Sequence, residues 1–425
     1  MNTTPLPYQM EDIEQVERWG GRALIGWDMS LGKSFGALLF AQRNPDARPI
    51  VVVCPAGLKH NWENEAQKHL GWRSTILEGT QPYSAVCPRS GIVIVNYDIL
   101  KAWLPRLRTL RPQLVILDEC HLLGNHKSQR SRAAKTICRD ARYVLGLSGT
   151  PLLNRPVELW HPLSIIRPNL FPSRWDFCLR FCDAKQKFYG WDLRGASNIP
   201  ELHATLRREV LVRRRKSDVL DQLPPVRRIV VPLDLVRRQE YDLAHQDFVQ
   251  WLRRHKPERI RSALRAERLT RANYLIHLAA QLKMPAALEW LDCYLQETEE
   301  KIILFATHRD VLHECYLAHR KRSVLIDGSI TEVQREEARK QFLCAERTRI
   351  LCGNIRAAGT GWNATGVPNL AFLELPWHPG AVEQAIGRCH GMDRGVQGES
   401  TTAFFLLARN TIETHLAELI QRKAV

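Results

Sequence analysis

The sequence predicts an α/β protein with two lobes, each built around a parallel β-sheet. Short apolar runs without polar alternation are separated by amphipathic stretches, which is typical of strands covered by helices on both faces. These runs occur in two sets that lie far apart in the chain. The length of 425 residues is enough for about two or three domains. A hydrophobic content of 44% lets each lobe bury a core.

The apolar runs give the expected strands in chain order. The first set comprises residues 23–25, 50–53, 91–95, 114–117 and 144–147. The second set comprises residues 302–305, 324–326, 350–351, 370–373 and 403–406. We therefore expect one sheet in a lobe of residues 1–223, with a helical insertion after residue 155, and another in a lobe of residues 224–425.

The region between the two sets, residues 236–297, is predicted to be largely helical. Its apolar residues recur at helical spacing: Tyr241, Ala244, Phe248, Trp251 and Leu252. Pro257 and Pro285 are expected to break this region into shorter helices, because proline lacks the backbone N–H of a helix interior. The adjacent Pro224 and Pro225 are expected to mark the junction between the lobes.

The charge of the chain indicates a polyanionic partner. Lys and Arg total 61 against 45 Asp and Glu, which gives a net charge of +16. Residues 206–275 hold 18 basic and 9 acidic residues, and the densest basic run is residues 213–216. A solvated helical face or a targeting patch is the alternative to a nucleic-acid surface. The N-terminus has no apolar core of a signal peptide, and no run approaches the ~20 apolar residues of a membrane span, so we expect no membrane partner.

A phosphate-binding loop is predicted after the first strand. Residues 26–34 follow the strand and precede an apolar helix, and they include Gly32, Lys33 and Ser34. Backbone N–H groups at such a turn point toward phosphate oxygens. Lys33 would reach the β- and γ-phosphates, and the Ser34 hydroxyl would bind Mg²⁺. Trp27 stands where the general pattern has a glycine, so this segment alone leaves the prediction open.

Two carboxylates follow the fourth expected strand. Asp118 and Glu119 come directly after residues 114–117, at the carboxyl end where parallel sheets bind ligands. Asp118 is predicted to hold Mg²⁺ through water, and Glu119 to polarise the attacking water as a general base. A pair of strand-end acids in a helix cap is the alternative. Their position about 85 residues after the Gly-Lys-Ser run makes the catalytic interpretation the stronger one.

Further segments carry a family resemblance. In the first lobe these are residues 6–9, 53–58 with Trp62 and Glu65, 96–98, 147–151, 154–156, 158–159 and 214–220 followed by 223–225. In the second lobe they are residues 327–329 with Arg335, 357–363, 377–379 and 384–390. Together with the phosphate loop and the Asp-Glu pair, they resemble the Swi/Snf-like ATPase branch of helicase superfamily two. Residues 191–196 and 155–156 favour its annealing-helicase subgroup.

The resemblance implies two RecA-like lobes with the nucleotide site in the cleft between them. It implies that Gln9 binds the adenine, that Arg388 acts as an arginine finger, and that Gln384 lines the same cleft. It also places Gly361 at the nucleotide. The residues that it implies at nucleic acid are Lys59, Asn96, Arg214, Arg215, Lys216 and Trp377.

Three positions depart from the family pattern. Ser30 replaces a glycine of the phosphate loop, which costs on the order of 1 kcal/mol if that backbone needs a positive φ. Trp27 stands where the family usually has an acidic residue. Gly391 occupies the place of a second arginine finger, and Arg394, one helical turn further on, is the expected substitute at the nucleotide.

The predicted function is an ATP- and Mg²⁺-dependent motor that moves along or remodels double-stranded or forked DNA, working as a monomer. The alternatives are a strand-separating DNA or RNA helicase and a slowly hydrolysing, ATP-dependent nucleic-acid clamp. We expect an intracellular location, in the cytoplasm or nucleoid of a prokaryote or in a virus-infected cell more than in a nucleus.

Overall fold

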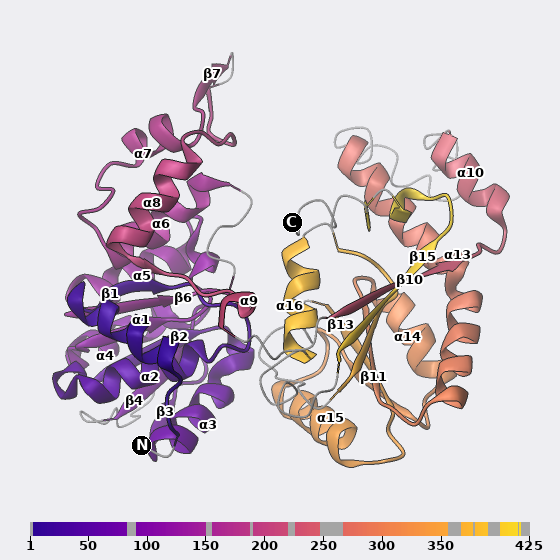
Figure 1. Ribbon diagram of the computed structural model, residues 1–425, viewed down its shortest axis with the longest axis horizontal. Helices are drawn as coiled ribbons and strands as arrows, with labels where there is room; N and C mark the ends of the chain where they lie inside the picture. The colour runs from indigo at the N-terminus through magenta and orange to yellow at the C-terminus, as the bar shows by residue number, and fades with distance from the viewer. Residues whose placement is uncertain are drawn as a thin grey trace. The chain divides into compact units, whose positions relative to one another are not determined.

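The computed structural model describes residues 3–82, 91–149, 155–187, 190–219, 226–246, 267–355, 367–376, 379–389, 400–414 and 416–417. The chain divides into two compact units, Met1–Asp221 and Gln222–Val425 (Figure 1). Pro224 and Pro225, the predicted lobe junction, lie outside the described residues.

The described part of the first unit contains one large parallel sheet of seven strands. Their order is β3 (Ser74–Ile76), β4 (Ile92–Asn96), β2 (Ile50–Cys54), β5 (Leu114–Leu117), β6 (Tyr143–Leu147), β1 (Arg22–Ile25) and β9 (Leu211–Val212). The five strands predicted in this unit are confirmed. β3 and β9 were not predicted, because each has at most three residues and too few apolar positions to form a recognisable run.

Helices cover both faces of this sheet, as the continuous apolar strands require. They are α1 (Pro7–Arg18), α2 (Lys33–Arg43), α3 (Lys59–Leu70), α4 (Leu100–Leu110), α5 (Gln129–Arg139) and α6 (Pro156–Ile166). One core contains Trp27, Phe40 and Trp62, and the core on the other face contains Trp103 and Leu163. Every residue of β2, β4 and β5 is buried, which explains why these strands lack polar alternation.

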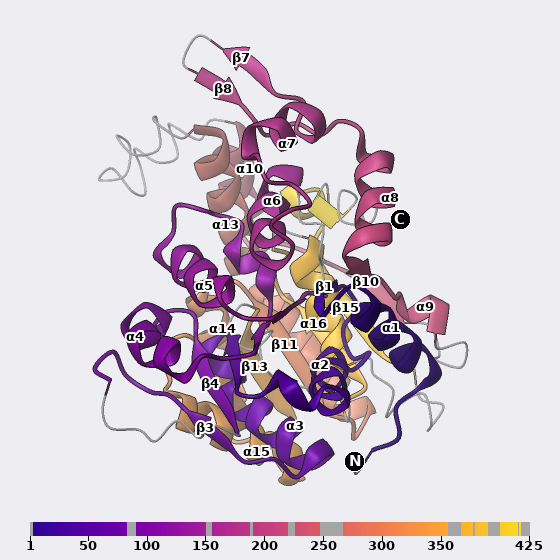
Figure 2. The same cartoon turned by 90° about the vertical axis from the view of Figure 1, so that its left-hand side faces the viewer.

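The segment after α6 extends the first unit away from its sheet. It contains α7 (Arg174–Phe181), an antiparallel hairpin of β7 (Lys185–Lys187) and β8 (Gly190–Asp192), and α8 (Ile199–Glu209). The short helix α9 (Lys216–Val219) follows β9. Figure 2 shows the hairpin at the far tip of this extension. The insertion predicted after residue 155 is thus helical with a small hairpin.

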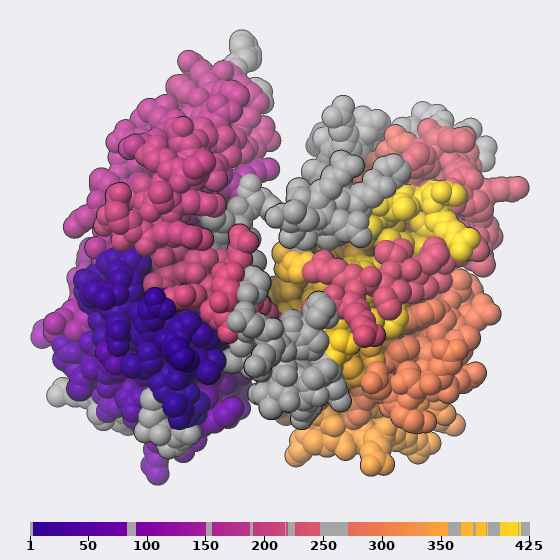
Figure 3. Space-filling view, in the orientation of Figure 1, coloured from indigo at the N-terminus to yellow at the C-terminus, as the bar shows by residue number. Residues whose placement is uncertain are grey.

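The second unit also contains a parallel sheet, of six strands in its described part. Their order is β10 (Arg227–Leu233), β15 (Thr402–Ala408), β14 (Asn369–Phe372), β11 (Ile302–Ala306), β13 (Ile350–Asn354) and β12 (Ser323–Ile326). The five strands predicted here are confirmed, and β10 is an additional edge strand. Its residues are mostly exposed and lie on the surface beside the yellow β15 in Figure 3. This exposure explains why its sequence did not resemble a buried strand.

The helices described in the second unit are α10 (Arg238–Gln246), α13 (Glu267–Glu297), α14 (Arg309–Ala318), α15 (Glu332–Cys344) and α16 (Pro379–Cys389). The helical prediction for residues 236–297 is confirmed at α10 and α13; Phe248, Trp251, Leu252 and Pro257 lie outside the described residues. The predicted break at Pro285 is wrong, because α13 continues through it. Burial of Met284 and Ala287 against the sheet offsets a proline cost of about 3 kcal/mol.

Within the described ranges, no helix combines the length and the apolar composition that crossing a bilayer requires.

Candidate active site

The phosphate loop has the strand–loop–helix geometry that its sequence predicts. β1 ends at Ile25 and α2 begins at Lys33, so residues 26–32 form the turn between them. Gly32 caps α2 in the left-handed region, at φ 76°. Ser30 also has a positive φ, 63°, so the condition attached to its predicted cost of about 1 kcal/mol is met. Ser34 is half-buried in the first turn of α2.

The Lys33 ammonium group lies over its own loop. Its Nζ donates to the carbonyl oxygens of Trp27, at 3.0 Å, and Asp28, at 3.2 Å. Gly149, which follows β6, packs closely here, since a Cβ on it would lie 3.3 Å from Lys33 Nζ. The loop carbonyls therefore hold the positive charge at the carboxyl edge of the sheet. This is where a lysine that contacts phosphates belongs.

The two predicted carboxylates are buried at the same edge of the sheet. Asp118 and Glu119 are each 7% exposed, directly after β5. Asp118 Oδ2 accepts from the indole Nε1 of Trp62 at 2.9 Å, and its Oδ1 accepts from the Glu119 amide at 2.9 Å. The Tyr97 hydroxyl donates to the Asp118 carbonyl at 2.7 Å. These bonds fix both the backbone and the side chain of Asp118.

Burial and, second to it, the negative charge of Glu119 raise the pKa of Asp118 to about 6. The hydrogen bond from Trp62 and the positive charge of Lys33 act in the opposite direction. Two adjacent buried carboxylates, one of them with a raised pKa, fit a divalent cation, because its charge would offset both. Asp118 and the Ser34 hydroxyl remain the predicted Mg²⁺ ligands.

Replacing Asp118 by asparagine is expected to change how stability depends on pH in the absence of metal and nucleotide. The pKa of Asp118 in the folded state, about 6, exceeds its ordinary 3.8, so the folded state of the wild type loses stability as pH rises between these values. Relative to wild type, the unfolding free energy of Asp118→Asn should therefore rise by on the order of 1 kcal/mol between pH 4 and pH 7, on top of a pH-independent cost, because the amide oxygen can accept from only one of the Trp62 and Glu119 N–H groups. Denaturant unfolding at several pH values measures this. The exposed Asp98 provides a control, because Asp98→Asn should change nothing; an equal effect there would contradict the explanation.

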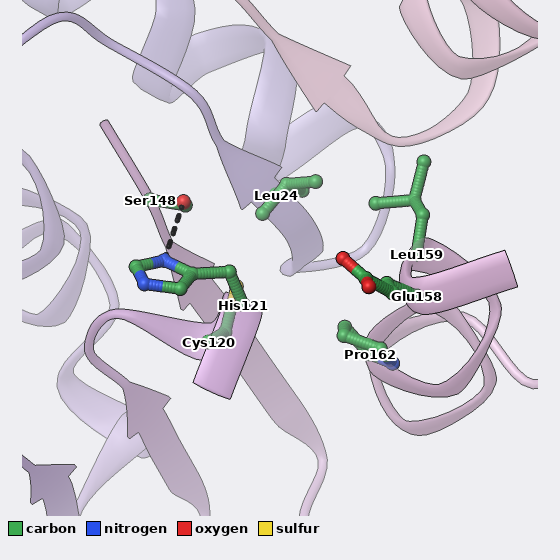
Figure 4. Close-up of a pocket in the computed structure, with 7 residues that line it drawn as sticks. All are labelled: Leu24, Cys120, His121, Ser148, Glu158, Leu159 and Pro162. Atoms are coloured by element: carbon green, nitrogen blue, oxygen red, sulfur yellow. Dashed lines mark hydrogen bonds between the residues drawn. The ribbon is translucent and has the colours of Figure 1, made fainter. Parts of the chain in front are cut away.

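A histidine connects the end of β5 to the end of β6. His121 Nδ1 lies 3.2 Å from Glu119 Oε2 and 3.1 Å from Ser148 Oγ. Figure 4 shows the His121 ring directed at Ser148 on one side of a small cavity. Glu158 and Pro162 of α6 line its other side. The contact joins the Asp-Glu segment to the segment of residues 147–151, of which 150 and 151 lie outside the described residues.

Gln9 is buried against the phosphate loop. Its Nε2 donates to the carbonyl of Leu31 at 3.2 Å, and its Oε1 accepts from the amide of Leu6 at 2.9 Å. The Tyr8 hydroxyl donates to the same Leu31 carbonyl at 2.8 Å. The N-terminal segment and the phosphate loop are therefore bonded together, which brings the predicted adenine-reading amide to the loop.

The other predicted residues of the first unit lie at several places. Asn96 is buried at the end of β4, and Lys59, at the start of α3, donates to the carbonyl of Leu77 at 3.2 Å. Arg215 is exposed and Lys216 half-buried. Arg214 is turned toward α1, where its guanidinium pairs with Asp12 at 2.7 Å.

The predicted residues of the second unit are described only in part. Gln384 is half-buried on α16, which also carries Arg388. The side chain of Arg388 lies outside the described residues, as do Gly361, Trp377, Gly391 and Arg394.

Sequence reasoning missed the residues that support Asp118. Trp62 belongs to one of the segments that carry the family resemblance, and its side chain is buried and bonded to Asp118. Tyr97 belongs to another recognised segment, residues 96–98, and supports the same aspartate. Their place in motifs marked them as functional, but only the fold shows which group they contact.

Comparison with known families identifies the chain. The SNF2-related domain family matches residues 13–283, and the helicase conserved C-terminal domain family matches residues 284–392. The chain belongs to the SNF2-related family. The Swi/Snf-like membership predicted from the sequence is confirmed, and the two domains of this SNF2-related chain are those of a helicase-superfamily ATPase.

Two curated relatives resemble nearly the whole SNF2-related chain. The SWI/SNF-related matrix-associated actin-dependent regulator of chromatin subfamily A-like protein 1 of Xenopus tropicalis is 31% identical over 98% of the chain. DNA annealing helicase and endonuclease ZRANB3 of Mus musculus is 29% identical over 100% of it. The chain spans 44% of the first relative and 40% of the second, less than half of each. A solved structure, "Sulfolobus solfataricus SWI2/SNF2 ATPase core in complex with dsDNA", is 19% identical, covers 99% of this chain and 92% of that one, and has a TM-score of 0.47.

Proposed function

We propose that the chain is an ATP-driven motor that moves along or remodels double-stranded DNA. One observation carries the proposal: the phosphate loop with Lys33 follows β1, and the buried Asp118–Glu119 pair follows β5, at the same carboxyl edge of the sheet, where β1 and β5 both pair with β6. Family membership supports it, as does the relative named a DNA annealing helicase.

The residues of the first unit supply the chemistry of ATP hydrolysis. Lys33 balances the charge of the phosphates, and Glu119 accepts the proton of the attacking water. Ser34 and Asp118 would hold Mg²⁺, which would supply positive charge to the phosphoryl oxygens. His121 contacts both Glu119 and Ser148, so it orients the Glu119 carboxylate toward the end of β6.

The second unit supplies charge for the transferring phosphoryl group. We assign Arg388 as the arginine finger, with Gln384 on the same helix and Gly361 and Arg394 at the nucleotide. The motor would contact DNA through its phosphates, and the net charge of +16 is compatible with this mode of binding. The proposed DNA contacts are Lys59, Asn96, Arg215, Lys216 and Trp377. A prokaryotic or viral source remains a prediction.

ATP hydrolysis measured with duplex, single-stranded and forked DNA and with RNA tests the proposal. Duplex or forked DNA is expected to stimulate hydrolysis more than RNA, with little dependence on base sequence. The apparent DNA affinity should fall steeply with salt, because phosphate contacts release counterions. Glu119→Gln should retain nucleotide binding and lose hydrolysis by at least about 100-fold. Normal hydrolysis by that variant would refute the assignment.

Two other outcomes would favour the alternatives. Displacement of a strand from a partial duplex would favour a strand-separating helicase. Tight ATP binding with negligible hydrolysis, unchanged by DNA, would favour a nucleic-acid clamp. The departures at Gly391 and Ser30 prompt the clamp alternative, and the positive φ of Ser30 is a local backbone strain in the phosphate loop.

A further inference from the structure

The chain segment of residues 212–216, here called the flanking segment, runs beside the phosphate loop. β9 pairs in parallel with β1, with Leu211 opposite Leu24 and Val212 opposite Ile25. The pairing continues past both strands: the amide of Gly26 donates to the carbonyl of Val212 at 2.8 Å, and that of Asp28 to the carbonyl of Arg214 at 3.0 Å. Gly26 and Asp28 of the phosphate loop are thus bonded to the backbone of the flanking segment.

Asp28 of the loop is held by side chain and backbone of the flanking segment. The Arg213 guanidinium lies 2.7 Å from Asp28 Oδ1 and also donates to the carbonyl of Gly26. The amide of Lys216 donates to Asp28 Oδ2 at 3.0 Å. Both carboxylate oxygens of Asp28 therefore have partners in the flanking segment, which fixes the direction of the loop after Trp27.

Trp27 is held through a buried aspartate. Its indole Nε1 donates to Asp12 Oδ2 at 2.7 Å, and Arg214 pairs with Asp12 Oδ1 at 2.7 Å. Trp27 is 0% and Asp12 5% exposed. The indole packs so tightly on α2 that a Cβ on Gly36 would lie 2.7 Å from two of its atoms. A charged guanidinium, a carboxylate and an indole N–H thus form one chain of contacts from the flanking segment to the loop.

These contacts act on the group that is expected to meet the phosphates. Lys33 Nζ is bonded to the carbonyls of Trp27 and Asp28, the same two residues whose side chains the flanking segment holds. A shift of either residue would move the acceptors of the Lys33 ammonium group. The flanking segment therefore determines where that ammonium group stands.

We propose that Arg213 and Arg214 are positioning residues of the nucleotide site, which clamp Gly26–Asp28 of the phosphate loop through Asp28 and through Asp12 and Trp27. The proposal rests on the proposed ATPase function. Arg214 then has a role different from the predicted nucleic-acid contact, because its guanidinium group forms ion pairs with Asp12 and Glu11. Arg215, which is exposed, keeps the predicted role at DNA.

Steady-state ATP hydrolysis without DNA tests this clamp on the phosphate loop, here called the loop clamp, in the variants Arg213→Ala and Arg214→Ala. Each variant is expected to raise the KM for ATP about tenfold or more, since each loses a charged contact that orders the loop. Arg207→Ala removes an exposed arginine on α8 and should leave KM unchanged. Duplex affinity over a salt series should match wild type for Arg213→Ala and Arg214→Ala. An unchanged KM, or a weaker DNA affinity with the salt slope reduced by about one for each variant, would overturn the loop clamp.

Two further measurements separate the loop clamp from a general loss of structure. Arg214→Lys, which can still pair with Asp12, should recover part of the loss. In the double variant Arg214→Ala with Asp12→Asn, the effects should not add, because both act through one chain of contacts. Additive effects would contradict the loop clamp.

A failure of the loop clamp is distinguishable from a failure of the ATPase assignment. If wild type hydrolyses no ATP under any condition, the proposed function fails. Binding of a fluorescent ATP analogue to wild type, Arg214→Ala and Arg207→Ala then decides the loop clamp by affinity alone. Equal affinity for all three proteins would overturn it.

Discussion

Replacing Lys33 by alanine is expected to lower kcat for ATP hydrolysis by at least about 100-fold, because it removes the charge that faces the phosphoryl group. The ammonium group lies at the carboxyl edge of the first sheet, bonded to the carbonyls of Trp27 and Asp28. It also lowers the pKa of Asp118 through its charge. The variant therefore loses both a phosphate contact and a counter-charge to the buried acids. Phosphate release under saturating ATP and duplex DNA measures the loss.

The alanine variant is expected to fold. Its two contacts are with loop carbonyls, which water can satisfy at this half-buried position. Lys135→Ala, which removes an exposed lysine from α5 of the same unit, is the matched control and should keep wild-type kcat. A Lys33→Ala protein with more than about half of the wild-type kcat would mean that the loop does not bind phosphate in catalysis.

The strands of both sheets could be predicted because burial on two faces leaves a continuous apolar run. Residues 50–54, 92–95 and 302–306 are buried throughout and are all apolar. The Asp118–Glu119 pair could be placed at a sheet edge for the same reason, since it directly follows such a run. Local pattern thus determined the strand positions and the residues at their ends.

Features that depend on contacts between distant segments could not be predicted. The basic run of residues 213–216 looked uniform, yet Arg213 and Arg214 turn toward acids of the loop and of α1 while Arg215 is exposed. The helix through Pro285 is continuous because packing on the sheet outweighs a local preference. In both cases the deciding partner lies far away in the sequence.

A buried ion pair in the second unit also depends on such a distant partner. Lys283 of α13 and Glu413, which follows β15, are 1% and 0% exposed in their side chains. Lys283 Nζ donates to Glu413 Oε2 at 2.6 Å and to the carbonyl of Leu406 at 2.5 Å. Glu413 Oε2 also accepts from the amide of Ala408 at 2.8 Å. The pair ties α13 to the end of β15.

Lys283→Met is expected to destabilise the second unit by about 3–5 kcal/mol, because it keeps the volume of the side chain and leaves Glu413 as a buried charge without its cation. Hydrogen exchange of the full chain measures this, through the protection of residues 302–306 and 402–408. The double variant Lys283→Met with Glu413→Gln should recover most of the lost stability. The side-chain oxygen of the glutamine can still accept from the backbone N–H of Ala408, and the glutamine carries no charge. A double variant as unstable as the single one would show that lost packing, and not the unpaired charge of Glu413, causes the destabilisation.

The pH dependence of the single variant gives an independent test of the same cause. Burial raises the pKa of Glu413, and removal of the Lys283 charge must raise it further. A carboxyl group whose pKa is higher in the folded than in the unfolded state loses stability as pH rises. The defect of Lys283→Met should therefore shrink as pH falls from 7 toward 5, whereas the double variant, which cannot take up that proton, should show no such recovery.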